Sequence, residues 1–277
     1  MAVPPLQALV AAGFEVTLVV SGADKRRGRR GAPEPSPVKA AALELGLPVT
    51  DRPGDAAEAG AECGVVVAYG RLIRRPVLEV LPMVNLHFSR LPRWRGAAPV
   101  ERALLAGDTS TAVCLMQLEE GLDTGPVYAC HDVAIGPDTT AAELRAELVA
   151  RGTELLVARL RDGLGTPTPQ EGEATYAAKL EPAELRLDWS RPAEELHRVV
   201  RVGGAWTTFR GRRLKVLRAR LAPDRVGPAP GELDGLHVGT GAGALELVEV
   251  QPEGKAPQAA TAWRNGARPE PGEALGS

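Results

Sequence analysis

The sequence predicts an α/β protein in which a doubly wound, mostly parallel sheet is followed by a small C-terminal β-barrel. Strands and helices alternate along residues 1–162, a pattern typical of doubly wound sheets. Residues 163–180 contain closely spaced Gly and Pro and indicate a linker. Residues 181–277 carry short strands separated by Gly and Pro turns, which favours a barrel. We therefore expect two domains, at 1–162 and 181–277.

The composition is that of a soluble globular protein. The chain has 277 residues, 44% of them hydrophobic, and a formal net charge of -2. No apolar run approaches the roughly 18 residues that a membrane span needs, and no secretory signal pattern is present. These features predict a cytoplasmic protein with no membrane association.

Three cysteines, Cys63, Cys114 and Cys130, stand at unrelated spacings in apolar surroundings. We expect all three to be buried thiols, because disulfides are rare in a reducing cytoplasm. Together with the four histidines they show no metal-ligand spacing, so no metal site is predicted.

Hydrophobic periodicity and capping residues predict the elements of the first domain. The first helix ends at Gly13, Ser36 caps a second helix, and Thr140 opens the last with a capping box. A further helix is expected at 99–107. The expected strands are 15–20, 64–68, a run ending at His87, 111–118 and 127–135.

In the second domain, Ser190 is expected to cap a helix. The expected strands that follow are 213–220, 231–233, 237–239, 245–250 and 259–263.

The chain opens on a helix, whereas a doubly wound domain is built outward from a central first strand. No later strand can take that place, because each has its own position in the sequence. We hypothesise that the chain as given is truncated before its first helix, and we expect two central strands to keep unpaired backbone groups.

Polar side chains gather at the end of the strand at 82–87. Asn85 and His87 are two residues apart, so in an extended strand both point to the same face. The loop that follows is broken by Pro and Gly and carries cationic and aromatic groups, the composition of an active-site loop. Further along, Gly121 and Gly125 leave the Asp123 carboxylate uncrowded. Taken singly, such a His and such an Asp are more often structural residues.

Tyr69, Gly70 and Leu72 follow the strand at 64–68. In open α/β sheets, ligands bind outside the carboxyl ends of strands, so this loop should share a crevice with Asn85 and His87. No G-x-G-x-x-G motif or P-loop occurs, which argues against a dinucleotide or nucleotide-phosphate enzyme.

Two segments concentrate positive charge. The run at 25–31 has five basic residues and no acid, and the segment 198–220 has eight and no acid. On the strand at 213–220, Arg213 and Lys215 alternate with apolar residues. Such charge is often only a solvated surface, but its single sign in a chain of negative net charge favours binding of a nucleic acid.

The string from Val84 to Pro99, together with Gly121-Leu122-Asp123-Thr124-Gly125, strongly resembles the methionyl-tRNA formyltransferases. The resemblance extends over nearly the whole chain, including 35–39, 176–180, 188–190 and 248–255. It implies a Rossmann-like formyltransferase domain followed by an OB-like barrel. It also implies that Asn85, His87 and Asp123 form the catalytic constellation.

The resemblance further implies a folate co-substrate and an RNA partner. The formyl donor would be 10-formyltetrahydrofolate, without a metal, and the acceptor initiator methionyl-tRNA. The residues implied in folate binding are Tyr69, Gly70, Leu72, Ser89, Arg90, Leu91 and Pro92. Those implied in tRNA binding are Arg26, Arg27, Arg29, Arg30, Lys179, Arg213 and Lys215. We expect a monomer that acts in translation initiation.

Alternative functions remain open at this point. A related folate-dependent formyltransferase could act on an amino sugar or glycinamide ribonucleotide, and a related hydrolase could use water, but small acceptors do not require two separated cationic segments. A non-catalytic RNA-binding relic is disfavoured because Asn85, His87 and Asp123 are retained. Arg90 stands where the family usually has Leu, so it either alters donor affinity or points outward.

Overall fold

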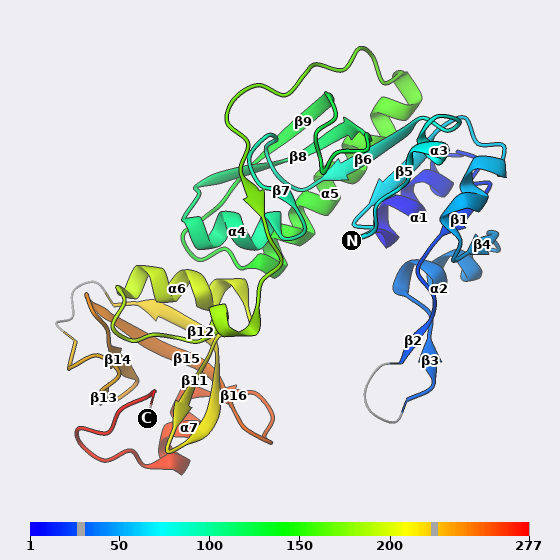
Figure 1. The fold of residues 1–277 in the computed structure, drawn as a ribbon. Coiled ribbons are helices and arrows are strands. Elements are labelled where there is room, and N and C mark those ends of the chain that lie inside the picture. The colour runs from blue at the N-terminus through cyan, green and yellow to red at the C-terminus, as the bar shows by residue number, and fades with distance from the viewer. Residues whose placement is uncertain (27–30, 223–226, 277) are drawn as a thin grey trace. The chain divides into compact units, whose positions relative to one another are not determined.

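The computed structural model of the chain describes residues 1–26, 31–222 and 227–276 (Figure 1). Two compact units are present. The first comprises Met1–Pro99, Ser110–Ala134 and Arg145–Ala178, and the second comprises Val100–Thr109, Ile135–Leu144 and Lys179–Ser277. Within the described part of the chain, every helix is too short or too polar to cross a membrane.

The helices and strands lie as follows in chain order. The α-helices are α1 (Val3–Ala11), α2 (Pro37–Glu44), α3 (Arg75–Leu78), α4 (Pro99–Ala106), α5 (Ala141–Asp162), α6 (Ala193–Val202) and α7 (Ala260–Ala267), with 3-10 turns η1 (Pro53–Glu58) and η2 (Pro182–Leu185). The strands of the first unit are β1 (Val19–Val20), β2 (Lys25–Arg26), β3 (Pro33–Glu34), β4 (Val49–Thr50), β5 (Gly64–Val67), β6 (Met83–His87), β7 (Arg95–Gly96), β8 (Ser110–Gln117), β9 (Val127–Ala134) and β10 (Tyr176–Ala177). Those of the second are β11 (Trp206–Phe209), β12 (Arg212–Leu221), β13 (Leu233–Asp234), β14 (His237–Gly239), β15 (Ala244–Pro252) and β16 (Gln258–Ala259).

The main sheet of the first unit has the strand order β5-β6-β8-β9. β5 and β6 are parallel, whereas β8 runs antiparallel to both β6 and β9. Helix α5 approaches this sheet at Gly152, where a Cβ atom would stand 2.8 Å from Val113 Cγ2. The sheet therefore agrees with the expected α/β class and with the strands expected at 64–68, 111–118 and 127–135.

A second, two-stranded sheet pairs β1 with β4 in parallel. The strand expected at 15–20 is therefore wrong in its extent, because only Val19 and Val20 find backbone partners there. An apolar cavity of about 580 Å³ lies between the two sheets, and both β1 and β5 line it. Among the described residues, β1 and β5 are not paired with each other and belong to separate sheets.

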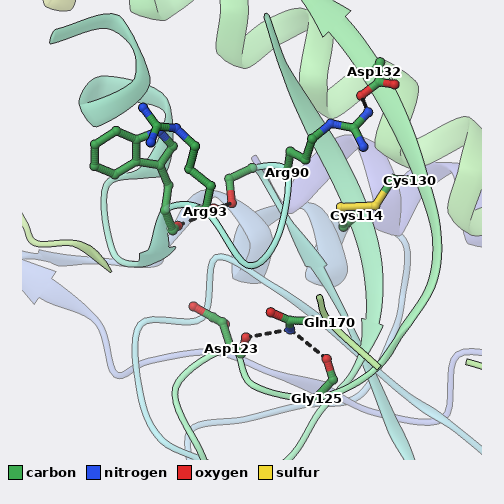
Figure 2. The surroundings of a disulfide bond; sticks show 10 residues. Arg90, Arg93, Cys114, Asp123, Gly125, Cys130, Asp132 and Gln170 are labelled. Carbon is green, nitrogen blue, oxygen red and sulfur yellow. Dashed lines mark hydrogen bonds and ion pairs between the residues drawn. A yellow bond between two sulfur atoms is a disulfide. The ribbon is translucent and has the colours of Figure 1, made fainter. Parts of the chain in front are cut away.

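Cys114 and Cys130 form a disulfide, so the expectation of three free thiols is wrong for these two residues (Figure 2). They face each other directly on β8 and β9, with their Cα atoms 4.1 Å apart. The register that brings them together depends on the turn between the strands, which the spacing of 16 residues does not reveal. Cys63 stays free, and its burial raises the pKa of its thiol.

Capping residues decide where several helices begin. The Ser36 hydroxyl accepts a hydrogen bond from the Lys39 backbone N–H at 3.2 Å, as expected. The expected capping box at Thr140 also forms, because the Thr140 N–H donates to the Glu143 carboxylate at 2.9 Å. The expected cap at Ser190 is wrong: its hydroxyl donates to Asp188 Oδ1 at 2.6 Å, and Pro192 is the N-cap of α6.

The second unit is built on an antiparallel sheet with the path β11-β12-β15-β14-β13, and β16 pairs with β15. The expected C-terminal β-strand domain is confirmed: all of its strand pairs are antiparallel, and the pairs described form an open path. Its core is an apolar cluster that includes Trp189, Leu196 and Val216. The strand expected at 259–263 is wrong beyond Ala259, because helix α7 begins at the next residue and buries Trp263.

Candidate active site

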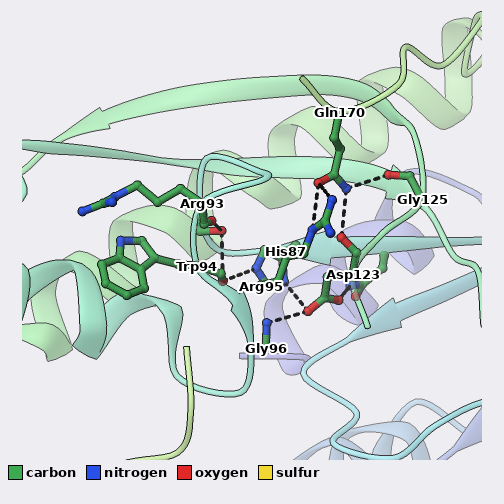
Figure 3. Close-up of polar contacts among 10 residues, drawn as sticks. His87, Arg93, Trp94, Arg95, Gly96, Asp123, Gly125 and Gln170 are labelled. Atoms are coloured by element: carbon green, nitrogen blue, oxygen red, sulfur yellow. Dashed lines mark hydrogen bonds and ion pairs between the residues drawn. The ribbon is translucent and has the colours of Figure 1, made fainter. Parts of the chain in front are cut away.

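Asp123 lies at the centre of the candidate active site (Figure 3). Its Oδ2 accepts a hydrogen bond from the Gly96 backbone N–H at 2.8 Å and stands 3.5 Å from His87 Nδ1. Its Oδ1 accepts from Asn85 Nδ2 at 3.4 Å. β6 carries Asn85 and His87, and Asp123 follows β8, which pairs with β6. The sheet thus brings together the three residues that the sequence singles out.

The His87 ring is buried and its protonation is defined by its neighbours. Nε2 lies 2.9 Å from the Trp94 carbonyl oxygen, which can only accept a hydrogen bond, so Nε2 carries the hydrogen. The lone pair of the neutral ring is then on Nδ1, facing Asp123. Burial lowers the pKa of His87 below its ordinary value of 6.5, against the opposing effect of Asp123, and Arg95 lowers it further. The imidazole is therefore neutral near pH 7 and can accept a proton at Nδ1.

This pKa shift makes the fold sensitive to acid. The folded state keeps His87 neutral while the unfolded chain binds a proton below pH 6.5, so stability is present above that pH and is lost as the pH falls. The free energy of unfolding should therefore fall with decreasing pH below 6.5. In a His87→Gln variant this fall should be shallower by up to about 1.4 kcal/mol per pH unit, the slope that one proton contributes. Denaturant unfolding between pH 5 and 8 measures it.

His197 serves as the internal reference for that measurement. Burial also lowers its pKa, and it remains in both proteins, so the difference between them isolates His87. Identical slopes for the two proteins would show that His87 is not held neutral by the fold.

The loop after β6 is fixed by its own backbone and by the linker. The Ser89 hydroxyl is fully buried and donates to the Arg93 carbonyl at 2.6 Å. The Trp94 N–H donates to Thr175 Oγ1 at 2.9 Å, and β7 pairs in parallel with β10. Trp94 itself has a φ of 62°, in the left-handed region that few side chains adopt. The role of residues near Thr175 is missed by sequence reasoning, because a linker shows no periodicity.

The expected folate-binding loops leave the sheet at one edge. β5 is parallel to β6 with Val67 opposite Leu86, so Tyr69, Gly70 and Leu72 emerge beside the loop that follows His87. The Tyr69 hydroxyl is buried and has no hydrogen-bond partner among the described residues. Leu72 is 74% exposed. The Leu91–Pro92 peptide bond is cis.

Arg90 points away from Asp123 and pairs with Asp132 on β9 (Figure 2). Its side chain is 55% exposed. Of the two expectations for this residue, the structure favours the outward one.

The cationic residues have mixed surroundings. Arg213 and Lys215 are exposed on β12, alternating with the buried Leu214, as expected for that strand. Arg213 also stacks over the Trp206 ring at 4.2 Å. Arg26 and Lys179 are exposed, whereas Arg27, Arg29 and Arg30 lie outside the described residues.

Two basic residues of the segment 198–220 are bound to other groups of the second unit. Arg201 is buried and donates to the Gly136 carbonyl at 3.0 Å. Arg210 pairs with Glu273, with Nη2 and Oε2 2.7 Å apart. Counting the charges of this segment therefore overstates its cationic surface. In the part of the chain that the structure describes, no group of three or more His, Cys, Asp or Glu could hold a metal ion.

The sequence profiles agree with this site and fold. Residues 6–160 match the family described as "Formyl transferase", and residues 179–268 match "Formyl transferase, C-terminal domain". The chain therefore belongs to the formyl transferase family.

The relatives are more specific. The chain is 46% identical to a methionyl-tRNA formyltransferase of Symbiobacterium thermophilum, covering 94% of this chain and 88% of that protein. It is 45% identical to a methionyl-tRNA formyltransferase of Roseobacter denitrificans, covering 98% and 94%. Among solved structures, HypX from Aquifex aeolicus in complex with tetrahydrofolic acid shares the fold at a TM-score of 0.61 and 20% identity, covering 80% of this chain and 43% of that one.

Proposed function

We propose that this protein transfers the formyl group of 10-formyltetrahydrofolate to the α-amino group of methionyl initiator tRNA, for translation initiation. The observation that carries the proposal is the Asp123 carboxylate between the Asn85 amide and the His87 imidazole. The methionyl-tRNA formyltransferases with which the chain shares about half its residues support this choice of acceptor.

The reaction forms one bond and breaks another at the formyl carbon. The neutral amine attacks that carbon, and the carbonyl oxygen becomes an oxyanion. The intermediate then collapses as the bond to the folate N10 breaks and N10 takes up a proton.

The three residues match these demands. Among the described residues the Asn85 amide donates to Asp123 alone, so its second N–H can donate to the oxyanion without titrating. Asp123 draws the proton from the amine and passes it to His87 Nδ1, which its Oδ2 faces, and this pair later returns a proton to N10. Asp123 stays close enough to stabilise the imidazolium that forms, since Oδ2 is 3.5 Å from Nδ1.

The donor would bind at the sheet edge, between the loop at 69–72 and the loop at 89–92. The parallel pairing of β5 with β6 supports this placement, because it brings the carboxyl ends of these two strands, and the loops that follow them, side by side. No metal enters the proposed reaction.

The acceptor would be held by basic residues. We propose that Arg26, Arg27, Arg29, Arg30, Lys179, Arg213 and Lys215 contact tRNA phosphates. We further propose that 1–162 is the catalytic domain, 163–180 a linker and 181–277 the tRNA-binding domain of a cytoplasmic monomer.

One assay tests the proposed function. The protein is incubated with labelled 10-formyltetrahydrofolate and charged initiator tRNA, with an amino-sugar nucleotide as a parallel acceptor. Label should appear on the methionyl-tRNA. Transfer to the sugar alone, or release as formate, would overturn the proposed acceptor.

Salt dependence tests the RNA surface. We expect an Arg213→Gln, Lys215→Gln variant to bind tRNA more weakly and to lose up to about two phosphate contacts' worth of slope in log Kd against log salt. Electrophoretic binding at several salt concentrations measures it. The matched control, Arg75→Gln with Arg151→Gln, removes two exposed cations from helices α3 and α5 and should leave the slope unchanged. An equal change in both variants would assign the effect to net charge.

A further inference from the structure

We propose that Gln170 is a positioning residue for formyl transfer, which holds the Asp123 turn and Arg95 in register with each other. The inference rests on the formyl transfer proposed above. Gln170 lies in the linker, between α5 and β10, where sequence patterns single out nothing.

The Gln170 amide uses its full hydrogen-bonding capacity (Figure 3). Nε2 donates to the carbonyl oxygens of Asp123 at 2.9 Å and Gly125 at 2.8 Å. Oε1 accepts from Arg95 Nε at 3.1 Å and Nη2 at 2.7 Å. A guanidinium only donates and a carbonyl only accepts, so the opposite orientation of the amide would lose every one of these bonds. The side chain is therefore specific to this place.

The Asp123 turn needs such support. Asp123 has a φ of 51°, in the left-handed region, which costs about 1 to 3 kcal/mol for a residue other than Gly and persists only where the surroundings hold it. Gly125 must be Gly, because a Cβ there would stand 2.0 Å from the Gln117 carbonyl oxygen. Gln170 donates hydrogen bonds to the carbonyl oxygens of both of these residues, Asp123 and Gly125, and so holds the turn in place.

The Gln170 side chain also binds the segment that contacts the Asp123 carboxylate, because its Oε1 accepts from Arg95. Arg95 precedes Gly96, whose N–H donates to Asp123 Oδ2 at 2.8 Å. Because Gln170 gives the Arg95 guanidinium a neutral partner, the Asp123 carboxylate keeps its contacts with Gly96, His87 and Asn85. One amide thus fixes both ends of the Gly96 to Asp123 contact.

The test uses Gln170→Met, which keeps the length of the side chain and removes all its hydrogen bonds. We expect kcat for formyl transfer to fall at least about tenfold with the KM values nearly unchanged, because the loss concerns a geometry needed in the transition state. In an Asp123→Asn background the same substitution should add less than about twofold, because Gln170 acts through that carboxylate. Full additivity, or a rise in KM alone, would overturn the proposal.

A second measurement does not depend on activity. Hydrogen exchange of the Gly96 amide should accelerate at least about tenfold in Gln170→Met, since its acceptor is no longer held. The control is Gln251→Met, which removes a side chain that donates to the Lys255 carbonyl in a turn of the second unit and should change neither readout. If the unaltered protein forms no formyl-methionyl-tRNA, the proposed function fails, yet the exchange measurement still decides the role of Gln170. Unchanged exchange at Gly96 would refute that role.

Discussion

Asp123→Asn should lower formyl transfer at least about 100-fold, within the range that general acid/base groups contribute. The substitution keeps the shape of the side chain but removes the charge that stabilises a protonated His87. It also sets an NH2 group against the donors on Gly96 or Asn85, both of which now donate to the carboxylate. Single-turnover transfer of labelled formyl to charged initiator tRNA measures the loss.

Glu154→Gln is the matched control, because it neutralises an exposed carboxylate on α5 that pairs only loosely with Arg151, at 3.4 Å. It should transfer formyl at the normal rate. Near-normal turnover by Asp123→Asn would remove Asp123 from the mechanism.

Asn85→Ala should lower kcat by about 100- to 1,000-fold, the usual cost of losing one oxyanion donor. The KM for the folate donor should change little, because the lost hydrogen bond strengthens only as charge develops on the formyl oxygen. Steady-state kinetics with varied donor and saturating tRNA separate the two parameters.

The control for this substitution is Asn265→Ala on α7, which truncates an exposed amide. If Asn85→Ala unfolds at a clearly lower temperature than the unaltered protein and so is partly unfolded in the assay, its fall in kcat would instead indicate a structural role for Asn85. Asn85 is only 8% exposed and touches Asp123, so both properties should be measured on the same preparation.

Local features of this chain could be predicted from the sequence where all the residues that determine a feature lie within one short segment. Asn85 and His87 share a strand, Ser36 and Thr140 cap helices through residues three positions away, and the strand at 213–220 alternates regularly. In each case the physical cause lies within a few residues of its effect. The three residues of the candidate site belong to this class, helped by the resemblance of their motifs to a known family.

Features that depend on partners far along the chain could not be predicted. Gln170 meets Asp123 from 47 positions away, and Cys130 meets Cys114 through the register of a hairpin. The strand at 15–20 has the right residues, yet only two of them pair with β4. Ser190 has a capping residue type, but its hydroxyl is taken by Asp188. In each of these cases several groups could form the contact, and the folded structure determines which of them come close enough to do so.

The separate pairing of β1 with β4 has a consequence for native-state dynamics. Helices α1 and α2 pack on this small sheet around Leu6, Val19 and Ala42, whereas β6 and β8 have both edges paired. So small a core supports little local stability, and the segment should open at lower free energy than the main sheet. The β2–β3 hairpin, with Lys25 and Arg26, belongs to that segment. A polyanion that binds these cations therefore also stabilises the segment against opening, so that affinity and local folding are thermodynamically linked.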